Sequence, residues 1–358
     1  MASAKKSPPP TPSPFWCRWQ AARGLEGSHL TIPDADLGGK WAIITGGNNG
    51  IGREAAIRFA SCGANIILGC REPPPHEKHP DVTASDCKAA AEAAGHNSST
   101  IKWWHCDMCD LASVEAFARR WLATGHALDI LANNAGMGRT ASGKLTITTD
   151  GFEIVHQVNF LSHVLLTMTL LPSLARAEDP RVVCSTSCMH YLGRFLPRTD
   201  ANRTAKPTSY SNNKLYFQTW LTELQSRLSA NPNLEHISVQ GVHPGFVNTG
   251  IWTAVKSAEE RREGGKGPLG DAVYNFFVSW FGIDAQQGSL AIVRAATAKE
   301  YATEKRGGEG GGRYFNRIWP AVPMPQTLDP GCRQEMWDFV GEELGLKDKG
   351  LLEMLDAL

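Results

Sequence analysis

A glycine-rich turn between an apolar stretch and a helical stretch limits the folds open to this chain more than any other feature. Residues 41–44 are apolar and indicate a buried strand, and residues 53–61 indicate a helix. Between them lie Gly46, Gly50 and Gly52, spaced G-x-x-x-G-x-G instead of the commoner G-x-G-x-x-G. Such a turn lets backbone N–H groups and a helix N-terminus approach a pyrophosphate. Taken alone, it also fits an ordinary strand-to-helix connection.

Tyr210 and Lys214 stand four residues apart in a stretch that predicts a helix, so both side chains lie on one face of it. The chain contains further motifs. Before the pair come Asn133-Asn134-Ala135-Gly136, Asn159 and the serines of 185–187, and after it comes His243-Pro244-Gly245. Together with the glycine turn they resemble the short-chain dehydrogenase/reductase family over roughly residues 38–345. Residues 150–153, 158–163 and 242–245 look most like its branch of retinol dehydrogenases and WW-domain oxidoreductases.

The resemblance implies an α/β fold: a single-domain, Rossmann-type, doubly wound parallel sheet with a substrate lid after the sixth strand. Apolar runs predict strands at 41–44, 65–70, 100–106, 128–132, 181–185, 237–242 and 313–315. The remaining patterns predict helices at 53–61, 82–95, 111–124, 150–174, 210–229, 286–299 and 333–344. Residues 1–15, rich in proline, are expected to be disordered and residues 16–38 to lie across the domain before the first strand, so that 1–37 form a disordered or loosely packed arm. Residues 38–345 then form the catalytic domain with its lid at 251–282, and 346–358 form a C-terminal tail.

The resemblance also implies four catalytic residues: Asn159, Ser187, Tyr210 and Lys214. Hydride transfer at a carbonyl carbon needs a proton to move at the oxygen. A free tyrosine, with a pKa of about 10, is a poor donor and acceptor near neutral pH. A neighbouring lysine ammonium and an oxidised nicotinamide would lower that pKa. Ser187 would hold the substrate oxygen, with Ser185 as a lesser candidate, and Asn159 would hold a water that links the lysine to solvent.

Arg71 follows the second predicted strand, where an arginine suits the 2′-phosphate of NADP(H) and an acidic residue suits NAD(H). We expect NADP(H), although Glu72 beside the arginine weakens the inference and an ordinary surface arginine is the alternative. By resemblance Asp107 contacts the adenine ring. The other expected cofactor-binding residues are Gly46, Asn48, Asn49, Gly50, Ile51, Gly52, Asn133, Ala135, Gly136, Tyr210, Lys214, Pro244, Gly245, Val247 and Thr249.

Composition excludes several other classes of protein. Lysine plus arginine and aspartate plus glutamate are both 36, so no charged field points to nucleic acid. Nine scattered cysteines do not fit a disulfide framework, and the N-terminus lacks an apolar signal sequence, so we expect a cytoplasmic protein. His76 with His79, and Cys106 with Cys109, are isolated pairs, and we expect no metal site.

Residues 273–281 are strongly apolar, but they are too few to span a bilayer. They fit best the wall of a hydrophobic substrate pocket, then subunit or core packing, and least an interfacial membrane contact. The sequence therefore predicts an NADP(H)-dependent oxidoreductase for a carbonyl or alcohol of an apolar, medium-sized, steroid-, retinoid- or secondary-metabolite-like molecule. The alternative is a non-catalytic NADP(H)-binding regulator or scaffold. Relatives often assemble through the helices that hold Asn159 and Tyr210, so we expect a homo-oligomer.

Overall fold

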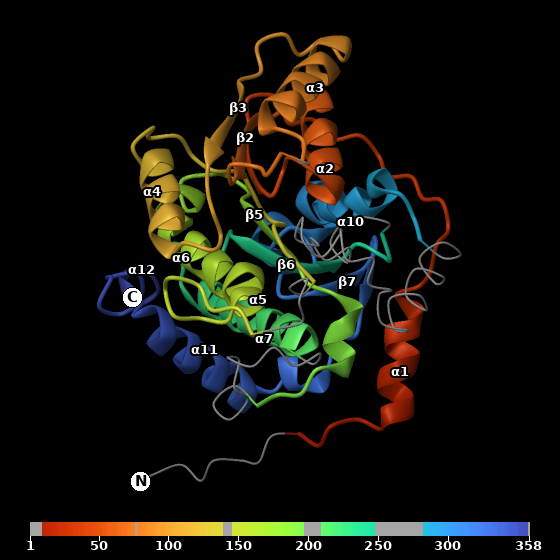
Figure 1. Ribbon diagram of the computed structural model, residues 1–358, viewed down its shortest axis with the longest axis vertical. Coiled ribbons are helices and arrows are strands. Elements are labelled where there is room, and N and C mark those ends of the chain that lie inside the picture. The colour runs from red at the N-terminus through yellow and green to blue at the C-terminus, as the bar shows by residue number, and fades with distance from the viewer. Residues whose placement is uncertain (1–8, 76, 139–144, 197–208, 248–281, 357–358) are drawn as a thin grey trace, which may run out of the picture.

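The computed structural model describes residues 9–75, 77–138, 145–196, 209–247 and 282–356 (Figure 1). Thr249, His76 and all of the expected lid except residue 282 lie outside these ranges. The described residues form one α/β domain around a single sheet.

The sheet has eight strands in the order β3-β2-β1-β4-β5-β6-β7-β8, parallel except for β8, which runs antiparallel to β7. Its strands are β1 (Trp41–Thr45), β2 (Asn65–Cys70), β3 (Ile101–His105), β4 (Ile130–Asn133), β5 (Arg181–Ser185), β6 (Ser238–His243), β7 (Tyr314–Asn316) and β8 (Trp319–Ala321). The predicted doubly wound fold is confirmed, and the predicted strands lie where the apolar runs placed them. The chain order reverses between β1 and β4, which is where open α/β sheets bind ligands.

Helices cover both faces of the sheet (Figure 1). On one face lie α2 (Gly50–Ser61), α3 (Pro80–Ala93) and α10 (Ala285–Thr297). On the other lie α4 (Leu111–Leu122), α6 (Ser162–Leu174) and α7 (Ser209–Ala230), with α11 (Pro330–Leu344) packed outside α7. The helix expected at 150–174 begins only at Ile154, as the short α5 (Ile154–His156), and winds as a π-helix η1 (Gln157–Leu161) before α6.

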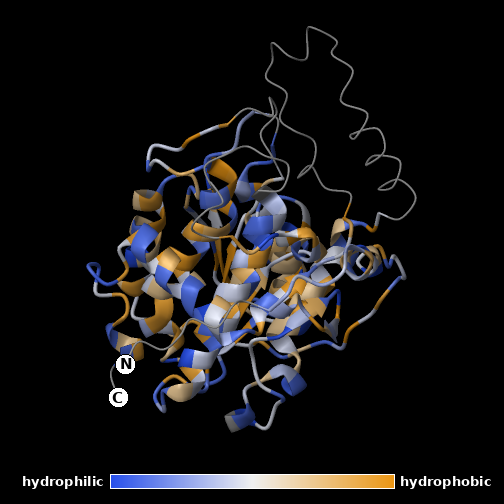
Figure 2. Cartoon of the chain, turned by 90° about the horizontal axis from the view of Figure 1, so that it is seen from below, coloured by the Kyte–Doolittle hydropathy of each residue, from blue (hydrophilic) through white to orange (hydrophobic). Residues whose placement is uncertain are grey.

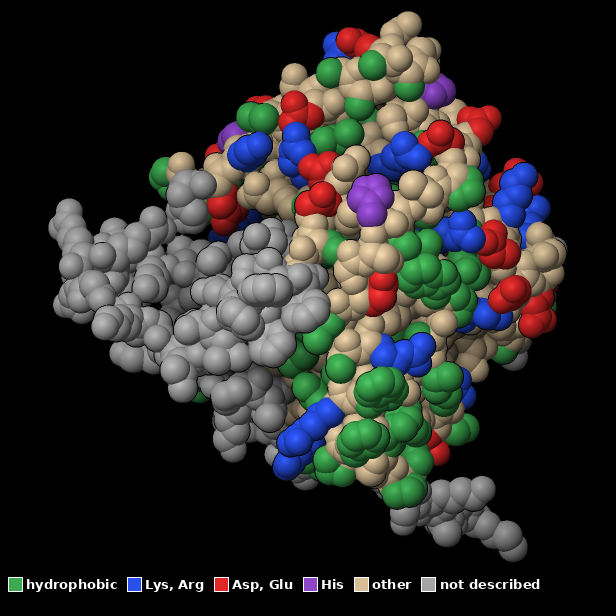
Figure 3. All heavy atoms as spheres, turned by 90° about the vertical axis from the view of Figure 1, so that its right-hand side faces the viewer, with side chains coloured by type: hydrophobic (Ala, Val, Ile, Leu, Met, Phe, Trp, Pro, Cys, Tyr) green, Lys and Arg blue, Asp and Glu red, His purple; other side chains and the backbone are tan. Residues whose placement is uncertain are grey.

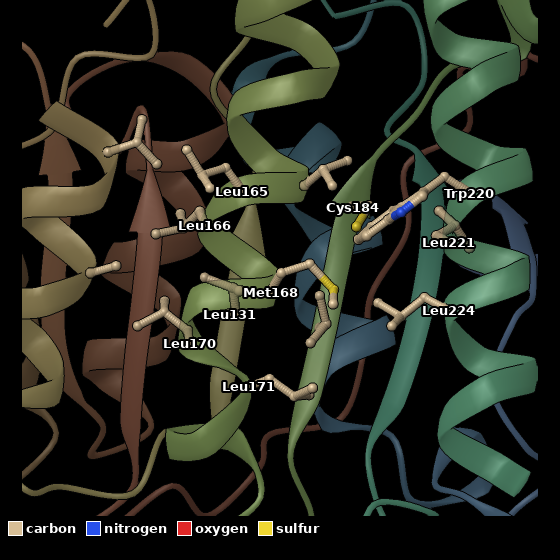
Figure 4. Packing of buried hydrophobic residues seen from close by; sticks show 14 of the residues in the cluster. Leu131, Leu165, Leu166, Met168, Leu170, Leu171, Cys184, Trp220, Leu221 and Leu224 are labelled. Atoms are coloured by element: carbon tan, nitrogen blue, oxygen red, sulfur yellow. The ribbon is translucent and has the colours of Figure 1, made fainter. Parts of the chain in front are cut away.

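The larger hydrophobic core fills the space between the sheet and the helices α6 and α7 (Figure 4). Leu166 and Leu170 of α6 and Leu131 of β4 belong to this core, while Trp220 and Leu224 of α7 lie over β5 and β6. Figure 2 shows hydrophobic residues concentrated on the central strands and hydrophilic ones on the outer turns of the helices. Residues 154–174 are long and apolar enough to cross a membrane, but 89% of the most apolar window is buried inside the domain, so core packing accounts for its composition.

Both ends of the described chain pack against the domain. Where the sequence predicted a disordered or loosely packed arm, a helix α1 (Pro14–Arg23) forms, with Pro14 in its first turn and Ser13 accepting a hydrogen bond from the Trp16 N–H. Cys17 and Leu37 are buried. At the other end Leu346 is buried, and the tail through α12 (Glu353–Asp356) lies against the larger core. The domain therefore extends beyond residues 38–345 in both directions.

Two surface grooves lie beside the N-terminal segment. One, of about 580 Å³, runs between α1 and β8 and is lined by Trp19, Leu25 and Trp319 among others. The second, of about 330 Å³, lies between α2, α10 and residues 29–32. Figure 3 looks at the side that carries α1 and shows hydrophobic side chains gathered low on it. Neither groove is lined by Ser187, Tyr210 or Lys214.

Candidate active site

The glycine turn joins β1 to α2 at the point where the strand order reverses. Gly46 and Gly50 have φ of 64° and 52°, values that favour glycine. Asn49 is the N-cap of α2 but makes no side-chain capping bond, and the first turn of α2 carries no acidic residue. The N–H groups at this helix end are therefore open to an anion.

The turn is packed tightly against the segment that follows β4. A Cβ on Gly52 would lie 2.4 Å from Asn134 Nδ2 and 2.5 Å from the Gly46 carbonyl oxygen. The Thr45 hydroxyl accepts hydrogen bonds from the N–H groups of Asn134 (2.9 Å) and Ala135 (3.0 Å). These contacts fix the carboxyl ends of β1 and β4 to each other, and a glycine cradle of this shape fits the pyrophosphate of a dinucleotide.

Asn48 and Ile51 connect the turn to its surroundings. Asn48 Nδ2 donates to the Lys78 carbonyl at 3.2 Å, and the Asn48 carbonyl accepts from the Thr83 hydroxyl at 3.2 Å. Ile51 packs against the core between the sheet, α2 and α10. The turn is thus held to the loop that follows β2.

The ends of β2 and β3 carry the residues expected near the adenosine. Arg71 is exposed and forms an ion pair with Glu77 at 2.8 Å. The Asp107 carboxylate accepts a hydrogen bond from the Cys109 N–H at 2.9 Å, which shapes the turn after β3. Arg71 and Asp107 both act electrostatically on the Cys109 thiol: Asp107 raises its pKa and Arg71 lowers it.

The Cys106–Cys109 pair lies at the end of β3, with Cys106 buried and Cys109 partly buried. Both thiols are free, and burial raises the pKa of both, that of Cys109 to about 11. A protonated thiol is a poor nucleophile and a poor metal ligand. Within the described ranges no three His, Cys, Asp or Glu side chains are grouped as a metal site would require, and His76 lies outside those ranges.

Side chains of α6 and η1 hold the end of β4 and the segment after it through hydrogen bonds. Asn133 is fully buried and donates to the Thr167 hydroxyl at 2.8 Å. His163 Nε2 lies 2.8 Å from the Ala135 carbonyl, and burial lowers the pKa of His163 to about 4, so the neutral ring donates this bond. Asn159 binds both backbone polar groups of Met137: its side chain accepts from the Met137 N–H at 2.8 Å and donates to the Met137 carbonyl at 2.7 Å.

Asn159 therefore braces residues 135–137 with its whole amide group. A Cβ on Gly136 would lie 3.2 Å from Asn159 Oδ1, so the loop and the π-helix are in contact. The π-helical turn at 157–161 offsets this side chain from ordinary α-helical positions, as such turns often do at functional sites. The water-holding role that the resemblance implies remains a prediction.

Ser187, Tyr210 and Lys214 come together at the carboxyl end of β5. The Ser187 and Tyr210 hydroxyls are hydrogen-bonded, and Lys214 Nζ lies 5.6 Å from the centre of the Tyr210 ring. Lys214 Nζ donates to the Ser185 carbonyl at 2.7 Å. All three side chains are less than 10% exposed. Their arrangement favours Ser187 over Ser185, whose hydroxyl is buried without a hydrogen-bond partner among the described residues.

The pKa values of this pair differ from the sequence argument, which expected Lys214 to lower the pKa of Tyr210. In the structure burial dominates and raises the pKa of Tyr210, while the Ser187 hydrogen bond works in the opposite direction. Burial also lowers the pKa of Lys214 to about 8. Burial disfavours the charged form of either group, so the protein alone leaves Tyr210 a neutral phenol at pH 7.

The turn after β6 lies at the carboxyl end of the sheet, next to the end of β5. Gly245 has φ of 101°, and a Cβ there would lie 2.7 Å from Ile283 Cδ1. Val247 forms a parallel β-bridge with Ile283, and Pro244 is partly exposed. The backbone between β6 and α10 is thus fixed as far as Val247, while Thr249 lies outside the described residues.

Sequence reasoning missed His190, which holds Ser187 in place. His190 lies in the 3-10 helix η2 (Cys188–Leu192), for which Ser187 is the N-cap. Its Nδ1 donates to the Ser187 carbonyl at 2.7 Å, and its Nε2 accepts from the Met324 N–H at 3.1 Å. Burial lowers the pKa of His190 to about 3, so the ring is neutral. No local pattern signals this role, because Met324 is 134 residues away along the chain.

Comparisons with known proteins agree with this geometry. The family model described as short chain dehydrogenase matches residues 40–260. Human retinol dehydrogenase 12 is 34% identical over 316 residues, which cover 88% of this chain and 89% of the relative. Human retinol dehydrogenase 13 is 28% identical over 336 residues, or 91% of this chain and 89% of the relative.

Two solved structures show the same fold. Carveol dehydrogenase from Mycobacterium avium, in complex with NAD, has a TM-score of 0.54 at 20% identity and covers 78% of this chain and 96% of its own. A short chain dehydrogenase from Burkholderia cenocepacia, in complex with NADP, has a TM-score of 0.51 at 21% identity with the same coverage of both chains. At these identities the likeness concerns the fold, and the two cofactors named do not choose between NAD and NADP for this chain.

Proposed function

Because this chain belongs to the short-chain dehydrogenase family, and within it to the retinol-dehydrogenase-like branch, we propose that it is an oxidoreductase that uses NADP(H) on an apolar, medium-sized carbonyl or alcohol. The observation that carries the proposal is the meeting of Ser187, Tyr210 and Lys214 beside the glycine turn and the 133–136 segment. These elements all stand at the carboxyl ends of neighbouring strands, where such sheets bind ligands.

The protein residues supply the proton and the alignment for the reaction. NADP(H), when bound, gives or accepts the hydride. In reduction the Tyr210 hydroxyl gives its proton to the carbonyl oxygen, and in oxidation the phenolate takes it back. The Ser187 hydroxyl donates a hydrogen bond to the same oxygen and stabilises the charge that develops there. Below about pH 8 Lys214 is an ammonium, which favours the phenolate after the proton has left.

The preference for NADP(H) rests on Arg71, whose guanidinium stands at the end of β2 and matches the geometry of a 2′-phosphate. Its ion pair with Glu77 is partly exposed and therefore weak, so a phosphate could take Glu77's place. The proposal of an apolar substrate is supported by the names of the relatives, retinol dehydrogenases 12 and 13, and by the apolar residues 273–281 of the sequence.

Any homo-oligomer is expected to form through surfaces other than α7, the helix that holds Tyr210. Residues 210–225 of α7 are buried in a single chain, and α11 lies over them. Trp337 of α11 stacks on Trp220, and Met336 and Val340 join the same core. A second copy therefore finds little of α7 to contact.

The decisive experiment compares NADPH oxidation by the parent, Tyr210→Phe and Tyr216→Phe across apolar aldehydes and ketones. Tyr216 stands on the same helix but belongs to the core, so it is a matched control. The parent should turn over, and Tyr210→Phe should lose roughly 100-fold or more in kcat/KM while still binding NADPH. Binding by the parent without turnover of any carbonyl or alcohol would instead favour the non-catalytic scaffold.

A further inference from the structure

The segment of residues 14–30, α1 and the extended chain after it, is here called the N-terminal belt. It lies at the right of Figure 1, and α1 packs against the short helix η2, whose N-cap is Ser187. Trp16 meets the ring of Tyr191 edge-on, with ring centres 5.6 Å apart, and Cys17 packs in one cluster with Cys188 and Tyr191. The belt therefore supports the helix whose first residues hold the catalytic serine.

Gly24, at the end of α1, lies directly against Cys188 and His243. A Cβ there would lie 2.7 Å from Cys188 Sγ and 2.8 Å from His243 Nε2. Its carbonyl lies 3.2 Å from His243 Nε2, and burial lowers the pKa of His243 to about 4, so the neutral ring donates this bond. Gly24 thus touches the residue after Ser187 and the residue before Pro244.

Arg317 fastens the remainder of the belt to the same turn. Its backbone N–H donates to the His243 carbonyl at 2.8 Å, and its φ of 56° is unusual for a residue other than glycine. The guanidinium is 1% exposed and donates to the Ser28 carbonyl at 2.6 Å and to the Glu26 carboxylate at 3.2 Å. A buried charge is stable only with such partners, so the belt must be docked for Arg317 to be accommodated.

A third connection runs through Gln287 of α10. Its side-chain oxygen accepts from the Leu30 N–H at 2.7 Å, and its nitrogen donates to the Leu30 carbonyl at 3.1 Å. The same oxygen accepts from Arg317 at 3.3 Å. The belt is therefore joined at several points to the two backbone segments, 187–188 and 243–245, that face the reacting end of the proposed cofactor site.

We propose that the N-terminal belt is a positioning element for the reaction, with Gly24 as its positioning residue. Gly24 sets how far η2 and the His243–Gly245 turn lie from Tyr210. It thereby sets the position of the Ser187 hydroxyl relative to the nicotinamide end of the cofactor site. Displacements of about 1 Å in such geometry cost roughly 100-fold in rate. The inference rests on the proposed function and adds to it a part of the chain that contains none of the family's motifs.

The test is Gly24→Ala against the matched control Gly341→Ala. Gly24 has helical φ and ψ of −70° and −11°, so the backbone accepts alanine and only the added methyl acts. An added methyl at Gly341 of α11 would meet nothing within 4 Å. Four quantities are measured for each: kcat, the KM of the carbonyl, the Kd of NADPH, and the emission of bound NADPH, which reports the surroundings of the nicotinamide.

Gly24→Ala should lower kcat about 10- to 100-fold, leave the Kd of NADPH within about threefold, and change the emission of bound NADPH. A milder second variant, Glu26→Gln, keeps the shape of the belt and weakens only the ion pair to Arg317. It should lower kcat about two- to fivefold, measured well below a melting temperature that falls because the buried guanidinium loses its carboxylate partner. Gly341→Ala should match the parent in every quantity.

A folded Gly24→Ala protein with kcat within twofold of the parent would overturn the proposal, as would a kcat loss equal to the loss of NADPH binding. Failure of the proposed function looks different, because the parent itself would then bind NADPH and turn nothing over. The emission of bound NADPH still decides in that case: if Gly24→Ala leaves it unchanged, the belt does not position the turn after His243.

Discussion

The glycine turn is fixed by one segment, the residues after β4, whereas the Ser187 end of the site is fixed by segments from both ends of the chain. The contacts of Gly46 and Gly52 with Asn134 and Ala135 are between motifs that the sequence displays openly. By contrast, His243 meets Gly24 across 219 residues and Arg317 meets Glu26 across 291. A dinucleotide cradle can therefore be carried by a local pattern, while the placement of the reacting groups depends on the whole domain.

Ser187→Ala should produce the largest effect at the long-range end. Loss of one hydrogen-bond donor to a developing oxyanion typically lowers kcat roughly 100- to 1,000-fold. Ser185→Ala is the control, because the Ser185 hydroxyl has no hydrogen-bond partner among the described residues and should matter little. Steady-state kinetics of both variants with NADPH and one carbonyl substrate measure the difference. Equal losses in the two variants would mean that the geometry assigned the wrong serine.

Gly52→Ala should produce the matching effect at the local end, in binding instead of rate. The added Cβ would collide with backbone at Gly46 and with Asn134, and overpacking of this kind costs about 1–3 kcal/mol. The Kd of NADPH, followed by nicotinamide fluorescence, should rise roughly 10- to 100-fold. Gly95→Ala is not a suitable control, because its φ of 87° adds backbone strain, so Gly341→Ala serves again. Unchanged NADPH binding would remove the glycine cradle from the cofactor site.

The strands and the glycine turn could be predicted because apolar runs and glycine spacing report local backbone needs. The order Ser187, Tyr210, Lys214 followed from the family resemblance, and the structure brings these residues together. Helix α1 was missed because Phe15 and Trp19 are exposed, so its apolar residues do not mark an inward face. The raised pKa of Tyr210 was missed as well, since burial depends on what the rest of the chain places around the ring.

Acid should weaken both ends, because buried, neutral imidazoles anchor each of them: His190 and His243 at the long-range end, and His163 at the segment after β4. In the folded protein the pKa values of His190 and His243 are lowered to about 3 and 4. In the unfolded chain a histidine has its usual pKa of about 6.5, so below pH 6.5 the unfolded chain takes up protons that the folded chain does not. This contribution to stability is complete above pH 6.5 and is lost as the pH falls towards 4. Each such histidine adds about 1.4 kcal/mol per pH unit to the slope in this window.

Urea unfolding of the parent and of His190→Gln at several pH values between 7.5 and 4 measures that slope. His190→Gln is expected to be less stable at pH 7.5 but to lose stability with acid less steeply, by up to about 1.4 kcal/mol per pH unit. His105→Gln, at an exposed position on β3, should keep the parent's slope. Parallel curves for the parent and His190→Gln would mean that folding does not lower the pKa of His190.

The smallest effect is expected from the ion pair at the adenosine end, because Arg71 and Glu77 are both partly exposed. Exposed pairs contribute at most about 1 kcal/mol, so removing the negative partner should free Arg71 for a 2′-phosphate by only a few fold. Glu77→Gln should therefore tighten NADPH about two- to fivefold and leave NADH nearly unchanged. Arg71→Ala should weaken NADPH alone. If Glu77→Gln instead weakens NADH, the Glu77 carboxylate binds the ribose hydroxyls, and the end of β2 selects NAD(H) even though an arginine stands there.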